Sequence, residues 1–319
     1  MAFDRVSLEV VYGLALPAYD QRRIFPLPVF VILPRMAVKP RIAIVGAGRL
    51  SGALAVSLRK AGYKIDRIIF RPAAGSQARA RRLAAEVGAR ASSIRSGTLS
   101  SAVVWLGVPD QALSRCAAML ARVADWKGKV LLHSSGALTS SELDAVKKKG
   151  AAVASVHPLM TFVEKVRPPL NGVPFALEGD RAAIRVARRM VLDLGGQPFS
   201  IAKENKAAYH AWGGFTSPLL VAALVIAEQV AMKAGMTREL ARRRMRPIVR
   251  QTLANYFATG PADAFSGPIT RGDVATVEKH LLVLAQIPEA KQVYLALANA
   301  AVKHLPTKNK KRLRRLLKE

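Results

Sequence analysis

Short apolar runs rich in β-branched residues alternate with longer helix-like segments from Arg41 onward. The runs are RIAIV, KIDRIIF, SAVVWLGV, KVLLHSS and AAVASVH. Strands and helices in alternation predict right-handed βαβ units, and hence a doubly wound parallel sheet of the α/β class with helices on both faces. Two later runs, VPFALEG and GGQPFSI, flank a helical segment and are expected to add strands at the far edge.

The pattern changes after Lys203, where no further strand is expected. Glycine and proline punctuate four helical stretches, which we predict over 205–234, 237–257, 271–286 and 288–304. A second, all-helical domain therefore follows the α/β domain. The predicted organisation is an extension over 1–38 that is poorly ordered, an α/β domain over 39–202, a helical domain over 203–305 and a basic tail over 306–319.

The extension does not resemble a secretory signal. Four prolines, at 17, 26, 28 and 34, break its apolar runs, and Asp4 lies where a signal would carry positive charge. Because Met36 stands just before the first strand, we expect residues 1–35 to be an extension, for which an over-long start assignment is one explanation. N-terminal sequencing of natively expressed protein would test this.

The composition is that of a globular protein. Hydrophobic residues make up 51% of the 319 residues, which argues against disorder, and no uninterrupted apolar run approaches the ~18 residues of a membrane span. The single cysteine, Cys116, excludes an internal disulfide and fits a reducing compartment. We therefore expect a cytoplasmic protein that does not bind a membrane.

The chain is strongly basic, with 50 Lys and Arg against 21 Asp and Glu and a net charge of +29. From Lys303 onward, eight cations and one acid give 8 − 1 = +7, and the remaining +22 is spread over the rest. The tail has no interleaved aromatic residues and no recognition motif. It predicts at most weak, non-specific and salt-sensitive contact with nucleic acid.

A glycine-rich turn follows the first strand, in the segment RIAIVGAGRLSGAL. Gly46 permits a tight turn, and Gly48 lets backbone amides approach a pyrophosphate at the positive end of the next helix. Ser51 occupies the position where a third glycine is usual. The predicted cofactor-binding turn comprises Gly46, Ala47, Gly48, Arg49, Leu50 and Ser51, and the alternative is a tight turn that binds nothing.

Charge after the second strand bears on which dinucleotide would bind. Asp66 lies 20 residues after Gly46, as an NAD-binding carboxylate would, but it falls near the start of its strand. The end of that strand carries Arg71, followed by Ser76 and Arg79. A cation there suits the 2′-phosphate of NADP, which we favour over NAD. The alternative is that these arginines are solvated surface residues.

A third turn follows SAVVWLG and contains Val108, Pro109 and Asp110. It lies at the carboxyl end of a predicted strand, where ligands bind in open α/β sheets, and we place it near the nicotinamide ribose. Asp110 could equally be the N-cap of the following helix.

Four of the five histidines lie in or after distinctive segments. His133 begins HSSGAL, His157 begins HPLMTF, His210 lies in AYHAW, and His280 follows GPITRGD. No two have the short spacing of metal ligands, and the cysteine is distant in sequence, so we expect no metal site.

The ordered motifs GAGR, VPD, HSSGAL, HPLMTF, LEGD, YHA and GPITRGD resemble those of an uncharacterised bacterial family. In that family a Rossmann-like NADP-binding domain is joined to domain of unknown function 2520. The resemblance covers residues 41 to about 300 and extends to pyrroline-5-carboxylate reductase, 6-phosphogluconate dehydrogenase and the β-hydroxyacid dehydrogenases. It implies a helical domain that dimerises and closes a substrate cleft, with 215–235 similar to the small-residue helix of the reductase pocket.

Two positions depart from the pattern of these relatives. The β-hydroxyacid dehydrogenases pair a helix lysine with an asparagine four residues later, whereas here Lys206 is followed by His210. Pro218 stands where family members often carry asparagine. Catalytic residues therefore cannot be assigned by the resemblance.

Candidates for catalysis come instead from the chemistry of hydride transfer, which needs a proton donor and a group that fixes the substrate. Histidine titrates near neutral pH, and His210, next to Tyr209, is our first candidate for the donor. His157 could line the same cleft, as could His133 with Ser134 and Ser135 as hydrogen-bond donors. For each histidine a packed, structural role is the alternative.

Arg271 could clamp a substrate carboxylate with two hydrogen bonds. Asp273, two residues later, could merely cap the following helix. Both interpretations stay open at the level of the sequence.

The sequence thus predicts an NADP-dependent oxidoreductase that works as a homodimer. Its substrate would be a small, anionic carbonyl or imine compound, or the corresponding hydroxy or amino compound. The alternative is a catalytically silent NADP-binding sensor or scaffold, which the missing lysine–asparagine pair favours.

Overall fold

The structure is a computed structural model that describes residues 38–318 apart from 72–74, 96–98 and 165. Pro40–Glu319 forms one compact unit. The expected extension over 1–38 lies outside the described residues except for its last position, as does the proposed start near Met36.

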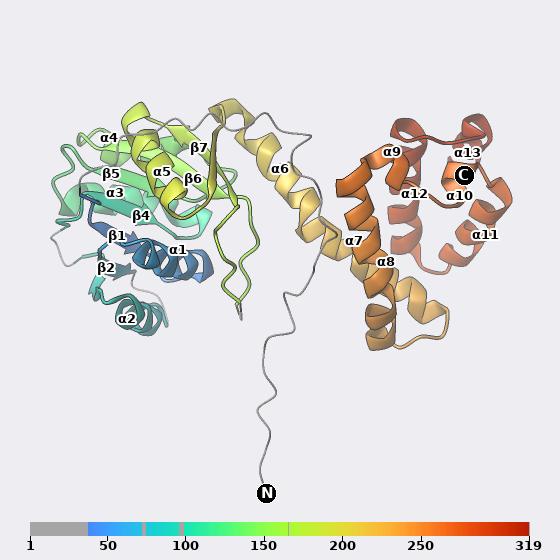
Figure 1. The fold of residues 1–319 in the computed structure, drawn as a ribbon, viewed down its shortest axis with the longest axis horizontal. Helices are drawn as coiled ribbons and strands as arrows, with labels where there is room; N and C mark the ends of the chain where they lie inside the picture. Colours follow the sequence, from blue (N-terminus) through green and yellow to red (C-terminus); the bar gives the residue numbers. More distant parts are fainter. Residues whose placement is uncertain (1–37, 72–74, 96–98, 165, 319) are drawn as a thin grey trace, which may run out of the picture. The chain divides into compact units, whose positions relative to one another are not determined.

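Eight strands form one sheet in the order β3-β2-β1-β4-β5-β6-β7-β8. Figure 1 labels β1, β2, β4, β5, β6 and β7 of this sheet. All neighbours pair in parallel except β6 and β7, which are antiparallel. The predicted α/β class is confirmed, although β3 was not expected from the sequence. The strands are β1 (Ile42–Val45), β2 (Ile65–Phe70), β3 (Arg90–Ser93), β4 (Val103–Leu106), β5 (Val130–His133), β6 (Ala152–Pro158), β7 (Pro174–Gly179) and β8 (Gln197–Ser200).

Helices cover both faces of this sheet because the central strands are apolar on both sides. In β1, Ile42 and Ile44 pack against one group of helices and Ala43 and Val45 against the other. The first face carries α1 (Arg49–Lys60), α2 (Ser76–Val87) and α5 (Arg181–Asp193); the second carries α3 (Leu113–Val123) and α4 (Asp144–Lys147), with the short helices η1 (Asp110–Ala112) and η2 (Ser140–Leu143) beside them.

After the short helix η3 (Lys203–Asn205), the described residues form helices alone, as predicted. The helix expected over 205–234 is interrupted at Ser217, whose φ of −130° and ψ of −80° are not helical. Pro218 explains the break, because it lacks an N–H and disfavours a helical residue before it. The helices are α6 (Lys206–Thr216), α7 (Pro218–Lys233), α8 (Arg238–Thr259), α9 (Pro261–Ala264), α10 (Pro268–Arg271), α11 (Val274–Leu284), α12 (Pro288–His304) and α13 (Lys310–Leu316).

Part of the predicted basic tail forms helix α13, which packs against α11 and α12. Leu313 of α13 and Leu317, just after it, are buried in a cluster with Val277 of α11 and Val302 of α12. Leucines at helical spacing give that helix an apolar side to bury, and the division of the chain at 306 stays a prediction.

Helices α6 and α7 together form a stretch, Lys203–Lys233, that is long and apolar enough to cross a membrane by length and composition. Little of it is covered within the single chain. Glu228 nevertheless lies inside this stretch, buried, and accepts hydrogen bonds from Arg242 of α8 at 2.7 and 3.0 Å.

Candidate functional site

The glycine turn between β1 and α1 has the geometry of an anion-binding loop. Gly46 has a φ of +98°, and a Cβ there would lie 2.3 Å from the carbonyl oxygen of Gly107, so only glycine fits. A Cβ on Gly48 would meet nothing within 4 Å. Gly48 begins α1 without a side-chain cap, which leaves the first amides of the helix free to face an anion.

This turn forms one wall of a cavity of about 290 Å³. The other walls follow β4 and β5, so the cavity lies at the carboxyl ends of three adjacent parallel strands. Eight of the predicted cofactor-binding residues line it, together with Leu106, Gly107 and Ser135. Those eight are Gly48, Arg49, Leu50, Ser51, Val108, Pro109, Asp110 and Ser134.

The two other residues of the predicted turn do not line the cavity. Gly46 shapes the turn from behind, where its amide donates to the carbonyl of Ile69 at 2.8 Å. Ala47 packs against the sheet's core.

The second strand places its two charged candidates at opposite ends. Asp66 follows Ile65, which pairs with Ile42 at the amino-terminal ends of β2 and β1. Its carboxylate accepts from the Ser101 hydroxyl at 3.2 Å. It is therefore far along the strand from the glycine turn. Arg71 follows the end of β2, at the same edge of the sheet as the turn. Burial raises the pKa of the Cys116 thiol, and the nearby Arg71 guanidinium partly opposes this rise.

His133 does not line the cavity, contrary to expectation. It is fully buried, its Nε2 lies 3.0 Å from the carbonyl of Thr139, and its Nδ1 accepts from the Ser135 amide at 3.1 Å. Burial and the charge of Lys206 lower the pKa of His133 to about 3, so the ring is neutral. Both ring nitrogens are used by the protein, which leaves none for a ligand.

Asp110 is not the N-cap of the following helices, because Pro109 precedes η1 and Ala112 precedes α3 at the cap positions. The Asp110 carboxylate instead accepts from the Ser135 hydroxyl at 2.8 Å. The same hydroxyl accepts from the amide of Leu138 at 2.9 Å. Ser134 receives a hydrogen bond from the Trp105 indole at 2.8 Å. These contacts hold the wall of the cavity between β4 and β5 in one arrangement.

Lys206, at the start of α6, connects this wall to the helical region. Its side chain is 1% exposed, and its Nζ donates to the carbonyl of Ser135 at 3.0 Å and to the hydroxyl of Ser155 at 2.6 Å. Burial lowers the pKa of Lys206 to about 8, opposed by the carboxylates of Glu178 and Asp110. The Lys206 ammonium group therefore binds oxygen atoms in the interior of the protein.

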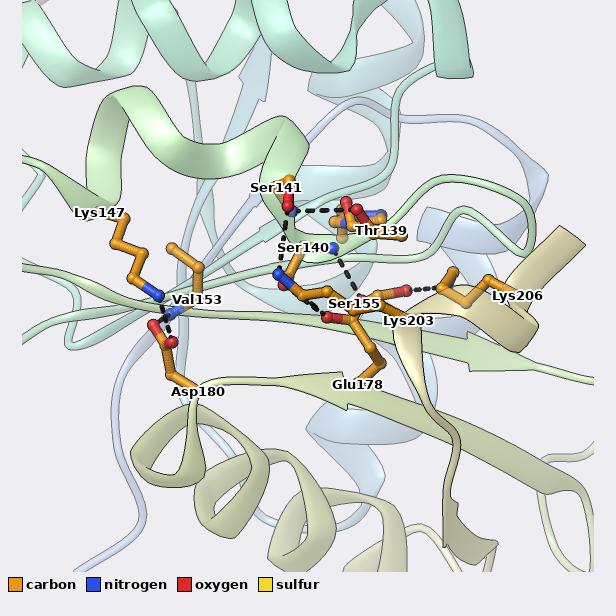
Figure 2. A network of polar contacts seen from close by, with 11 residues as sticks. Thr139, Ser140, Ser141, Lys147, Val153, Ser155, Glu178, Asp180, Lys203 and Lys206 are labelled. Carbon is orange, nitrogen blue, oxygen red and sulfur yellow. Dashed lines mark hydrogen bonds and ion pairs between the residues drawn. The ribbon is translucent and has the colours of Figure 1, made fainter.

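A buried carboxylate supports the same junction (Figure 2). Glu178 of β7 accepts from the amide and the hydroxyl of Ser140 at 2.8 and 2.7 Å, and Lys203 lies 3.8 Å from it. Lys203 also donates to Ser141 at 3.1 Å. Two lysines from the start of the helical region thus bind the same part of the α/β domain.

Next to Ser135, two of the predicted catalytic histidines come together. His157 of β6 and His210 of α6 have ring centroids 6.2 Å apart. A Cβ on Gly136 would lie 2.5 Å from His210 Cδ2 and 2.8 Å from His157 Nε2, so both rings close over this glycine. The Tyr209 hydroxyl lies 2.8 Å from Nδ1 of His157.

The pKa values of half-buried His157 and buried Tyr209 differ from the ordinary values of these groups. Burial, with Lys206 and His210 nearby, lowers the pKa of His157 to about 4, and burial raises the pKa of Tyr209 to about 12. At neutral pH both groups are uncharged. His210 is exposed and makes no described hydrogen bond through its side chain.

The structure does not bring Arg271 to these histidines. It lies exposed on α10 and is not among the residues that line the cavity. Asp273 caps α11, accepting from the amide and hydroxyl of Thr276 at 3.1 and 2.7 Å. In the part of the chain that the structure describes, no three metal-ligating side chains of the His, Cys, Asp or Glu type gather.

The sequence patterns do not predict the roles of four residues of this site: Gly136, Lys206, Tyr209 and Ser135. Each lies within one to four residues of a histidine that the sequence predicts to be a site residue. Their roles depend on contacts between segments about 20 to 75 residues apart, such as Lys206 with Ser135, for which local patterns carry no signal.

Two domain-family models match the chain. A Rossmann-like domain matches residues 34–158, and the domain of unknown function DUF2520 matches residues 173–301. The fold is therefore that of a Rossmann-like domain followed by a helical domain. More particularly, the chain joins a Rossmann-like domain to a DUF2520 domain, as its resemblance to that family predicted.

Solved structures show the same architecture. A Bacteroides fragilis protein, provisionally assigned as an NADP oxidoreductase, is 18% identical over 82% of this chain and 97% of its own, with a TM-score of 0.69. A Thermotoga maritima protein is 25% identical over 81% and 96%, with a TM-score of 0.63. An imine reductase from Myxococcus stipitatus, solved with NADP+, is 18% identical over 87% and 100%, with a TM-score of 0.63.

These likenesses concern the fold. A comparison with curated proteins found no match.

Proposed function

We propose that this protein is an NADP-dependent oxidoreductase that transfers a hydride between nicotinamide and a small, anionic carbonyl or imine compound, or its hydroxy or amino counterpart. One observation carries the proposal. A cavity at the carboxyl ends of β1, β4 and β5 begins at a glycine turn and ends at Ser135, next to the paired rings of His157 and His210. The proposed nucleotide site would thus lie next to the proposed proton-transfer site.

The residues present fit a dinucleotide. The amides at the start of α1 would hold the pyrophosphate, since Gly48 leaves open space in front of them. Arg71 at the end of β2 would bind the 2′-phosphate of NADP, and Val108, Pro109, Asp110 and Ser134 would border the nicotinamide ribose. When bound, the cofactor supplies or accepts the hydride.

The histidine cluster would manage the proton and orient the substrate. Tyr209 keeps its proton at neutral pH, and when it donates to Nδ1 of His157, the ring proton of His157 lies on Nε2, facing Gly136. That N–H can donate to a substrate oxygen or nitrogen. His210, exposed beside it, is our proposed proton donor.

The binding step is tested by thermal-shift measurements with NADPH and NADH. We expect a larger shift with NADPH, and a smaller shift for Gly48→Ala, whose methyl group would enter open space without strain in the fold. Gly214→Ala is the matched control, because a Cβ there also meets nothing within 4 Å. No shift of the unmodified protein with either cofactor would overturn the cofactor assignment.

Cofactor preference is tested at Arg71. The variant Arg71→Gln should lose affinity for NADPH and keep its affinity for NADH, because only NADPH carries the 2′-phosphate. An equal loss for both would assign Arg71 a structural role beside Cys116.

The alternative of a silent NADP-binding sensor or scaffold is favoured by Lys206. Both of its described hydrogen bonds go to protein acceptors, and His210 stands where the related dehydrogenases have asparagine. Screening small oxo acids and imines for loss of NADPH absorbance separates the two functions. Turnover that His210→Ala abolishes, with cofactor binding intact, supports the enzyme; binding without turnover of any compound supports the sensor.

The protein would function as a homodimer in the cytoplasm. Large apolar side chains are exposed on three consecutive helices of the single chain, and such patches mark contact surfaces. They include Trp212, Phe215, Leu219, Val221, Val225, Ile248, Tyr256 and Phe257. A second copy of this chain is the proposed occupant.

A further inference from the structure

Helix α13 and the residue pair after it carry a row of cations on one side. Lys311, Arg314, Arg315 and Lys318 are spaced by three and four residues, which places them on one face of a helix, and all four are exposed. Arg312 is exposed at the border of this row. We call the four residues the α13 cation row.

The opposite face of α13 is occupied. Leu313 is fully buried and Leu317 is 3% exposed, and Leu316 is partly buried beside them. Packing of these leucines on α11 and α12 directs the cation row away from the core. The orientation of the row is therefore a consequence of the tertiary structure.

Folding of the helix does not require this arrangement of charge. Like charges three or four residues apart destabilise a helix, and Lys311 at its start opposes the helix dipole, whereas Arg314 and Arg315 lie in the last turn, where the dipole favours cations. No acidic residue occurs between Glu289 and Glu319, and the described ion pairs include none of the cation row. The row is thus positive charge without a partner inside the described chain.

The row is also held in a fixed position. Asn309, with a φ of +51°, turns the chain into α13, and its side-chain amide donates to the carbonyl of Gly272 at 3.0 Å. The Lys308 amide donates to Thr270 at 3.0 Å. A surface ordered in advance avoids the entropy cost of ordering a flexible tail when a ligand binds.

We infer that the α13 cation row binds the phosphate backbone of duplex nucleic acid, without reading its sequence. Arginine and lysine ends bind phosphate oxygens directly, and a regular row matches the closely spaced charges of a duplex. This binding is independent of the proposed oxidoreductase site, because no member of the row lines the cavity.

The surface around the row argues for a duplex over other anionic partners. Binding in the plane of a bilayer uses an apolar helix face, and here that face is buried. Single strands are bound by stacking on aromatic rings, and residues 303–318 contain no Phe, Tyr or Trp.

The test is fluorescence anisotropy of a short labelled duplex DNA with the full chain at several salt concentrations. A variant with Lys311, Arg314, Arg315 and Lys318 all changed to glutamine should lose affinity at least about tenfold, and its slope of log K against log salt should fall by about 3 to 4. The matched control changes two lysines and two arginines, Lys148, Lys149, Arg181 and Arg185, which are also exposed. The control should bind as the unmodified protein does.

Because the leucines are retained, the row variant should unfold at the same temperature or higher, which circular dichroism checks. The double change Arg314→Gln and Arg315→Gln should give an intermediate loss. Equal losses in row variant and control would overturn the inference, as would no binding by the unmodified protein at about 50 mM salt. Tighter binding to phosphatidylserine vesicles, or to a single strand of the same length, would also overturn it.

Discussion

Ser51 and Gly107 are fitted to each other at the floor of the candidate cofactor cavity. Ser51 replaces a glycine that usually lets α1 pack closely on the sheet, and its hydroxyl instead donates to the carbonyl of Gly107 at 3.3 Å. A Cβ on Gly107 would lie 1.9 Å from that hydroxyl. Gly107, just after β4, thus leaves the space that the Ser51 side chain fills where α1 usually has a glycine.

Gly107→Ala should lower the free energy of unfolding by about 1 to 3 kcal/mol, the usual range for overpacking. The loss should be smaller in a Ser51→Gly background, because the clashing hydroxyl is gone. Urea unfolding of the single and double variants measures this coupling. Equal losses in both backgrounds would show that the clash is relieved elsewhere.

His133 couples stability to pH. Its pKa is about 3 in the folded protein against 6.5 ordinarily, so the unfolded chain binds the proton more readily. The stability that depends on the neutral ring is complete above pH 6.5 and is lost as the pH falls toward 3. By pH 5 the loss from this residue is about 2 kcal/mol.

Urea unfolding between pH 7 and pH 5 checks the prediction for the unmodified protein and for His133→Asn. The asparagine can still accept from the Ser135 amide but does not titrate. It should be less stable at pH 7 and lose less stability on acidification. A variant with the same pH slope as the unmodified protein would assign the effect to other groups, such as His157.

At the level of elements, two helices differ from their sequence pattern for clear reasons. The long apolar stretch 205–234 becomes α6 and α7 because Pro218 breaks it, and α6 then carries Lys206, Tyr209 and His210 against the α/β domain. The basic tail becomes α13, because its leucines complete the cluster of α11 and α12.

Leu313→Ala should therefore lower the free energy of unfolding by about 2 to 5 kcal/mol, as for other buried leucines. Leu297→Ala is the control, since Leu297 is 60% exposed on neighbouring α12. Thermal and urea unfolding measure both. A Leu313 variant as stable as the control would mean that α13 contributes nothing to the cluster.

For the whole molecule, the exposed apolar face of α6, α7 and α8 has the most influence on solution behaviour. Val221 on α7 is 59% exposed and Leu282 on α11 is 68% exposed, so a charge at either position costs the single chain little. Only Val221 lies on the proposed dimer surface.

Light scattering after size exclusion should give twice the mass of one chain for the unmodified protein and for Leu282→Glu. Val221→Glu should give a monomer. An unmodified monomer would contradict the proposed homodimer. Recovery of the protein with membranes would contradict the proposed cytoplasmic location, given the length and hydropathy of Lys203–Lys233.

Local patterns were sufficient for most of the fold. Apolar runs with flanking glycines predict β1, β2, β4, β5 and β6 because each strand is buried on both faces and leaves a continuous apolar signal. Strand β3, with the sequence RASS, lies at the sheet edge and is only partly covered, so its residues carry no such signal.

The candidate site also has some features that the sequence predicts and others that it does not. The glycine turn and the segments at Val108 and Ser134 could be predicted, because the requirement for a particular backbone shape is written in consecutive residues. The burial of His133, the pairing of His157 with Tyr209 and the interior position of Lys206 could not be predicted. They arise when parallel strands and α6 converge at one edge of the sheet, and burial, which sets the charge state of each group, exists only after the chain has folded.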